Sequence, residues 1–198
     1  MDILIKKFGG TSVATLESMK MVQGKIEEGL ASGKKIIAVL SAQAGETNRL
    51  LAMADKWSAN PDTAECDVLV STGEQVSVSL FTMLLKDAGI KARSLLGWQI
   101  PIITNQDFGN ARILSVDKNA LLDYLNEFDV LVVAGFQGQT EDGRITTLGR
   151  GGSDTSAVAL AAALDSAECE IYTDVDGVYT TDPNICSTAR KMTRIAYD

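Results

Sequence analysis

Short runs rich in β-branched residues alternate with longer stretches of helical periodicity along almost the whole chain. This alternation is typical of an α/β fold, with a largely parallel central sheet covered by helices on both faces in three αβα layers. The most apolar of the expected strands is DVLVVAGF, residues 129–136. With 198 residues, of which 45% are hydrophobic, the chain can bury the core of one ordinary domain. We therefore expect one α/β domain over residues 1–198.

Periodicity and turn residues place the individual elements. We expect strands near residues 2–7, 34–42, 92–95, 101–104, 112–115, 129–136 and 170–180. We expect helices near residues 15–31, 49–58, 74–88 and 118–127, and a further helix after the glycines at 149–152. Residues 137–148 are predicted to form a hairpin that turns at Glu141, Asp142 and Gly143. Polar loops follow several strands, and ligands of open α/β sheets bind at the carboxyl edge where such loops meet.

The overall charge narrows the class of partner. A net charge of −8 argues against a nucleic-acid binder or a membrane-surface binder, because both partners are polyanions. No apolar stretch is expected to approach the roughly 20 residues that span a bilayer, and the start MDILIKKFGG lacks the layout of a signal peptide. We expect a cytoplasmic protein with small-molecule partners.

Two features of composition restrict the chemistry. The chain has no histidine, which removes the commonest general base and the commonest transition-metal ligand. Its three cysteines, Cys66, Cys169 and Cys186, have no spacing typical of a zinc site or a disulfide framework. Any reaction must therefore use carboxylates, lysine, arginine, hydroxyls and backbone amides, which suits a nucleophile that is already ionised at pH 7.

The segment GRGGSDTS at 149–156, followed by the apolar run AVALAAAL, predicts a glycine-rich turn leading into a helix. Its glycines let the backbone approach a ligand, and the amides of a helix N-terminus attract anions. Arg150 can hold a carboxylate or phosphate through two hydrogen bonds, and we expect Ser153 or Asp154 to cap the helix. The alternative interpretation is an ordinary capped junction between loop and helix.

A second candidate anion site is KFGGTS, which begins at Lys7 and follows the first expected strand. Its glycines would bring amides against a phosphate, and Lys7 would add a positive charge. The alternative is a simple turn with a solvated lysine. Neither the P-loop pattern GxxxxGK[ST] nor the dinucleotide pattern GxGxxG occurs in the chain.

Six segments together resemble the aspartate kinases of the amino acid kinase superfamily, in the order of that family. They are KFGGTSV, SAQAGETNRLL, VSTGEQVSVSLF, AGFQG, TTLGRGGSDTSAVALAAAL and IYTDVDGVYTTDP. The resemblance implies the amino acid kinase fold and transfer of the γ-phosphoryl group of ATP, with Mg²⁺, to the side-chain carboxylate of L-aspartate. That reaction is the first step toward lysine, threonine and methionine. The resemblance also implies a homo-oligomer, expected to be a dimer, for the full protein.

The matching segments imply roles for individual residues. Lys7 and Asp154 would be catalytic, with Asp154 holding the lysine by a charge-assisted hydrogen bond. The aspartate pocket would consist of Ser41, Thr47, Glu74, Phe136, Arg150 and Ser153. The nucleotide would contact Lys7, Gly9, Gly10, Thr11, Thr173, Asp174, Tyr179 and Asp182. Mg²⁺ would lie mainly on phosphates and water, so no protein ligand is expected for it.

Two departures from the family are visible. Asn184 stands where the motif usually ends in a phosphate-binding arginine, so nucleotide affinity is weaker or Arg190 or Lys191 substitutes. The chain also ends at Asp198, before a later lysine-bearing segment and two regulatory ACT domains of the family. We therefore expect an incomplete kinase domain without feedback inhibition. Two alternatives remain, an inactive fragment that binds aspartate or nucleotide, and a related kinase acting on N-acetylglutamate or glutamate.

Overall fold

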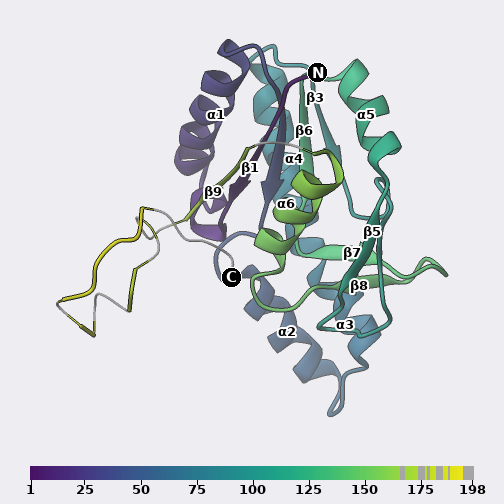
Figure 1. The fold of residues 1–198 in the computed structure, drawn as a ribbon. Helices are drawn as coiled ribbons and strands as arrows, with labels where there is room; N and C mark the ends of the chain where they lie inside the picture. The colour runs from purple at the N-terminus through teal and green to yellow at the C-terminus, as the bar shows by residue number, and fades with distance from the viewer. Residues whose placement is uncertain (166–167, 174–176, 178, 182–184, 187, 194–198) are drawn as a thin grey trace.

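The computed structural model describes residues 1–165, 168–173, 177, 179–181, 185–186 and 188–193. Its centre is a five-stranded sheet in which all neighbouring strands are parallel. In spatial order the strands are β3 (Ala92–Leu95), β6 (Val130–Ala134), β2 (Lys35–Leu40), β1 (Ile3–Phe8) and β9 (Cys169–Tyr172). Helices cover both faces of this sheet (Figure 1), so the predicted three-layer α/β architecture is confirmed.

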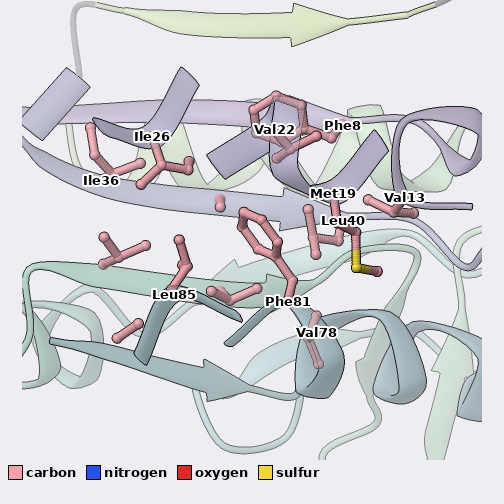
Figure 2. Close-up of a cluster of buried hydrophobic side chains, with 14 of the residues drawn as sticks. Phe8, Val13, Met19, Val22, Ile26, Ile36, Leu40, Val78, Phe81 and Leu85 are labelled. Carbon is pink, nitrogen blue, oxygen red and sulfur yellow. The ribbon is translucent and has the colours of Figure 1, made fainter. Parts of the chain in front are cut away.

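One face of the sheet packs against α1 (Leu16–Ala31) and α4 (Thr72–Asp87). Figure 2 shows this core, in which apolar side chains from both helices meet alternate residues of β1 and β2. Its fully buried members include Phe8, Ile26, Leu40, Phe81 and Leu85. Each such side chain contributes roughly 1.5–3 kcal/mol when it is fully buried.

The opposite face packs against α5 (Lys118–Glu127) and α6 (Gly152–Ala163). Ile5, Ile37 and Val133 supply its strand side chains, one residue out of step with those of the first face. This alternation follows from the two-residue period of a strand. It leaves Lys6 on the α1 side of the sheet and Lys7 on the α6 side.

Lys6 fixes the edge strand β9. Its Nζ donates to Glu170 Oε2 at 2.6 Å and to the Tyr172 hydroxyl at 3.1 Å, and that hydroxyl donates to Glu170 Oε2 at 2.6 Å. The Tyr172 ring stacks on Phe8 with centroids 4.7 Å apart. Burial lowers the pKa of Lys6, but the two hydrogen bonds outweigh it and raise the pKa above 10.5. Lys6 is therefore a structural cation.

A second, four-stranded sheet was not anticipated from the sequence. Its order is β5 (Ile113–Val116), β4 (Ile102–Thr104), β7 (Gln137–Gln139) and β8 (Ile145–Thr147). β7 and β8 form the predicted antiparallel hairpin over 137–148. The sheet lies beside α2 (Glu46–Trp57) and α3 (Thr63–Val70) at the lower end of the molecule in Figure 1.

Several predicted bounds are wrong for physical reasons. β6 ends at Ala134 because Phe136 has a left-handed φ of 69°, which an extended strand does not allow. The helix predicted at 49–58 begins at Glu46, and α3 was missed altogether, although Asp62 caps it by accepting from the Glu65 amide at 3.1 Å. β9 ends at Tyr172, earlier than the predicted 180.

α3 and α4 run together over residues 63–87 and are, by length and composition alone, long enough and apolar enough to cross a membrane. Polar residues interrupt the stretch, which is why no uninterrupted apolar run stands out in the sequence. Half of the most apolar part of this stretch is buried inside the protein, as in a core helix.

Candidate active site

A cavity of about 320 Å³ opens at the carboxyl ends of β1, β2 and β6, against the N-terminus of α6. Chain segments far apart in sequence converge here because the parallel strands end at one edge. The cavity is lined by Lys7, Gly9, Gly10, Ser41, Ala42, Thr47, Glu74, Phe136, Gly149, Arg150, Gly151, Gly152, Ser153 and Asp154. All eight side chains expected for aspartate binding and catalysis are therefore brought together.

Lys7 and Asp154 form an ion pair in this cavity. Lys7 Nζ lies 2.6 Å from Asp154 Oδ1, and the lysine side chain is 10% exposed. Asp154 Oδ1 is buried and accepts no aligned hydrogen bond within the described residues, so the predicted charge-assisted hydrogen bond is replaced by a purely ionic contact. The pair holds a buried ammonium at the cavity wall with its positive charge only partly offset, since Asp154 is itself 46% exposed.

The turn before α6 differs from the predicted cap. The N-cap is Gly151, which has a left-handed φ of 75°, and no side chain caps the helix. Asp154 lies in the first turn, where a negative charge suits the helix dipole. The Gly152 and Asp154 amides donate to the carbonyls of Gly149 and Gly151, whereas the Ser153 amide has no partner among the described residues. The Ser153 amide in this turn is thus available to an anion.

Arg150 is exposed at the rim of the cavity. Its guanidinium makes no hydrogen bond or ion pair with any part of the chain that the structure describes. Arginine can grip a carboxylate through two parallel hydrogen bonds. The Arg150 guanidinium is therefore available to bind an incoming anion.

Glu74 supplies the opposite charge from the first turn of α4. Its side chain is buried, and Oε1 accepts from the Ala42 amide at 2.9 Å. Oε2 is buried with no partner among the residues described. Burial raises the pKa of Glu74 to about 7, although the Ala42 amide opposes the shift. An unpaired buried carboxylate oxygen facing a cavity favours a ligand that brings a hydrogen-bond donor or a positive charge.

Phe136 and the start of α6 are tightly packed. A Cβ at Gly152 would lie 2.8 Å from Phe136 Cδ2, and one at Gly135 would lie 2.8 Å from Ser153 Cβ. Ser156 Oγ accepts from the Phe136 amide at 3.0 Å, which helps to hold the strained backbone. These contacts fix Phe136 and Ser153 as adjoining walls of the cavity.

The residues expected to bind nucleotide are only partly assembled in this cavity. Gly9 and Gly10 line it, and a Cβ at Gly10 would come within 2.7 Å of the Ala42 carbonyl oxygen. The Gly9 amide donates to the Tyr172 carbonyl at 3.3 Å, so it holds β9 and does not face a phosphate. The end of β9 therefore lies beside the glycines.

Three other expected nucleotide residues, which the structure describes, are not among the residues that line the cavity. Thr11 is exposed in the short 3₁₀ helix at Gly10–Val13, and Tyr179 makes an isolated bridge with Lys191. Thr173 follows β9 directly. Asp174, Asp182 and the departure at Asn184 lie outside the described residues.

Some functional groups left no readable signal in the sequence. The Ala42 amide that holds Glu74 is a backbone group, so its residue type reveals nothing. The predicted cap at Ser153 or Asp154 is wrong because the helix begins earlier, at Gly152, and the left-handed backbone of Gly151 caps it without a side chain.

No cluster of three or more metal-ligating side chains occurs among the residues that the structure describes. Of the two carboxylates at the cavity, Asp154 is paired with Lys7 and Glu74 is half satisfied by an amide. Mg²⁺ prefers several oxygen ligands in octahedral geometry. The described side chains therefore do not form a preformed magnesium site.

Comparison with known proteins agrees with this geometry. An aspartokinase of Geobacillus stearothermophilus is 50% identical over 198 residues, all of this chain and 49% of that protein. The structure of E. coli aspartokinase III in complex with aspartate and ADP superposes with a TM-score of 0.82 at 32% identity, over 96% of this chain and 53% of that one. A Synechocystis aspartate kinase gives 0.81 at 44% identity, over 95% and 31%.

The chain spans about half the length of the curated relatives that it matches. The match to the amino acid kinase family extends over residues 2–198, so it includes every segment that lines the cavity. The chain therefore belongs to the amino acid kinase family.

Proposed function

We propose that this chain is the N-terminal part of the kinase domain of an aspartate kinase, which transfers the γ-phosphoryl group of ATP to the side-chain carboxylate of L-aspartate. The observation that carries the proposal is the pairing of an available guanidinium, Arg150, with the unpartnered buried oxygen of Glu74 at one cavity. These opposite charges suit the α-carboxylate and the α-ammonium of a free amino acid. The aspartate-bound structure of E. coli aspartokinase III, to which the chain is similar, supports the same substrate.

Arg150 would hold the α-carboxylate and Glu74 the α-ammonium, while Ser41, Thr47, Phe136 and Ser153 complete the pocket. The β-carboxylate would then point toward Lys7. Because a carboxylate is already ionised at pH 7, the reaction needs no general base, which agrees with the absence of histidine.

Charge is the main obstacle to this reaction. Two like charges 4 Å apart repel by about 4 kcal/mol at an effective dielectric constant near 20. Lys7 would offset that repulsion by neutralising charge on the transferring phosphoryl group, and Asp154 would keep its ammonium in place. The Ser153 amide and Gly10 would assist at the same group.

The nucleotide would lie beside Gly9 and Gly10, with Thr11, Thr173, Asp174, Tyr179 and Asp182 around its phosphates, ribose and adenine. Mg²⁺ would arrive on the ATP phosphates with its water ligands. We further propose that the full-length protein is cytoplasmic and forms a homodimer, and that its C-terminal half carries the feedback control.

A substrate panel tests the proposal against the related carboxylate kinases. The buried Glu74 oxygen favours a free α-ammonium, which N-acetylglutamate lacks. In a coupled assay, the full-length protein should consume ATP with L-aspartate and not with N-acetylglutamate or glutamate. Preference for either of those acids would overturn the assignment. Thermal stabilisation by aspartate without turnover would instead identify a binding protein.

Lys7→Ala tests the mechanism in the full-length protein. We expect kcat to fall by about 10³-fold, the scale of losing a group that stabilises transition-state charge. Lys25→Ala, which breaks the exposed ion pair with Glu28, serves as a control with unchanged kcat. An unchanged rate of aspartyl phosphate formation in Lys7→Ala would rule out the proposed role of the lysine.

A further inference from the structure

Asp67 is a buried carboxylate that the proposed mechanism does not use. It lies in α3 and is 2% exposed. Its Oδ2 accepts from the amides of Gly109 and Thr147, both at 2.9 Å, and its Oδ1 accepts from the Thr147 hydroxyl at 2.6 Å. It forms no ion pair within the described residues. Since burying an uncompensated charge is costly, these three donors decide whether the carboxylate is tolerated.

The donors belong to segments that lead to the cavity. Thr147 ends β8, three residues before Arg150, and its carbonyl accepts from the Ala111 amide at 2.8 Å. The next amide, of Leu148, donates to the Phe136 carbonyl at 2.9 Å. Every hydrogen-bonding group of Thr147 is therefore occupied, and the backbone entering the Arg150 turn is fixed from both sides.

The second segment reaches the same turn from the other direction. Gly109 is followed by Asn110, whose Oδ1 lies 2.6 Å from the position that a Cβ on Gly149 would take. Gly149 has a left-handed φ of 73°, and its carbonyl accepts from the Gly152 amide at 3.0 Å. The Arg150 backbone is thus held between Gly149 and the cap of α6.

A second hollow, of about 480 Å³, adjoins the candidate active site. Asp67, Thr147 and Gly109 line it together with Arg150, and it shares Phe136 and other wall residues with the first cavity. Asp67 and Arg150 therefore border the same hollow.

We propose that Asp67 is a positioning residue for Arg150. By binding the Thr147 and Gly109 segments to α3, it sets the place from which the guanidinium reaches the α-carboxylate of the substrate. Loss of Asp67 should therefore weaken binding of the amino acid and leave binding of the nucleotide unchanged. This inference rests on the function proposed above, because it assigns the carboxylate-binding role to Arg150.

The test uses Asp67→Leu and Thr147→Val in the full-length protein. Leu has nearly the same branched shape, but it offers no acceptor to the two amides that face Oδ2 or to the Thr147 hydroxyl. We expect the KM for aspartate to rise about tenfold, which corresponds to the roughly 1.4 kcal/mol expected when a buried acceptor is removed. The KM for ATP should stay within about twofold. Thr147→Val should raise the KM for aspartate by a smaller factor. Thr147→Ser, which keeps the hydroxyl, should have the wild-type KM for aspartate.

Thr82→Val is the matched control. Its hydroxyl is buried and donates to the Val78 carbonyl within α4, so its loss removes a buried hydrogen bond elsewhere. Equal losses of stability with an unchanged KM for aspartate in all variants would overturn the positioning role. If Asp67→Leu does not fold, Thr147→Val decides alone. A wild-type protein that neither consumes ATP with aspartate nor binds aspartate would overturn the proposed function, and this inference with it.

Discussion

The buried side chain of Glu74 faces the ligand cavity and also makes the stability of the protein depend on pH. One of its oxygens is satisfied by the Ala42 amide, and the other faces the cavity without a partner. A raised pKa means that the folded protein holds a proton at pH values where the unfolded chain has lost it. The stabilisation linked to this proton is complete below pH 4.5 and is lost as the pH rises to about 7.

Glu74→Gln should remove this dependence, because the amide oxygen still accepts from Ala42 and no proton is exchanged. The difference between 4.5 and about 7 corresponds to a free energy on the order of 3 kcal/mol. Denaturant titrations from pH 4.5 to pH 8 should show the wild-type free energy of unfolding falling relative to that of Glu74→Gln by an amount of this order. Glu141→Gln, in the exposed hairpin turn, is the control and should follow the wild type. Parallel curves for wild type and Glu74→Gln would contradict the prediction.

At the scale of elements, the N-terminus of α6 is an adapted helix end. Its two glycines have different roles. Gly151 caps the helix with a left-handed backbone conformation, whereas Gly152 packs so closely against Phe136 and Leu148 that a side chain has no room. The same helix brings Asp154 to Lys7 and Ser153 to the cavity wall. Close packing at this helix end is therefore what aligns the cavity.

Two glycine-to-alanine variants in helices should have opposite effects. A Cβ at Gly152 would lie 2.8 Å from Phe136 Cδ2 and 2.9 Å from Leu148 Cβ, so Gly152→Ala should destabilise the protein by about 1–3 kcal/mol. Gly24, inside α1, has no atom within 4 Å of such a Cβ, and Gly24→Ala should stabilise by about 0.5–1 kcal/mol. Denaturant unfolding measures both. A neutral or stabilising Gly152→Ala would contradict the packing argument.

The sequence alone predicts those elements that have a strong hydrophobic periodicity or a clear capping residue. α5 was predicted at its observed bounds, and Thr15 marks the start of α1 through a capping box with Ser18. α3 was missed because its Asp62 cap follows an Asn-Pro pair that is typical of a loop. The lining of the active-site cavity was predicted mainly from family motifs. Asp67 could not be predicted, since its partners come from segments far along the chain.

At the scale of the whole molecule, burial is unevenly distributed. Every residue of β2 from Ile36 to Leu40 is fully buried, while α2 buries only Leu50 and leaves Trp57 90% exposed. The division into two sheets could not be read from strand patterns, because short strands of similar composition occur in both. The central sheet is therefore the most deeply buried support of the site, and α2 is the described α-helix with the fewest buried residues.

Amide hydrogen exchange should reflect this division. Amides of β2 and β6 should exchange only through global unfolding, whereas those of α2 should exchange through local opening at a lower free energy. Mass spectrometry of peptides at increasing denaturant measures both. Protection of α2 equal to that of β2 would show that the helix is held more firmly than its burial indicates.

Neighbouring lysines on β1 serve opposite sides of one sheet, since Lys6 anchors Glu170 and Tyr172 while Lys7 meets Asp154. A one-residue slip of this strand would exchange the positions of the two ammonium groups. Lys6 would then face the cavity, and Lys7 would face α1. Inserting or deleting a single amino acid within β1 would therefore damage the edge strand and the chemistry at the same time. The register of β1 against β2 and β9 therefore decides which of the two lysines faces the cavity.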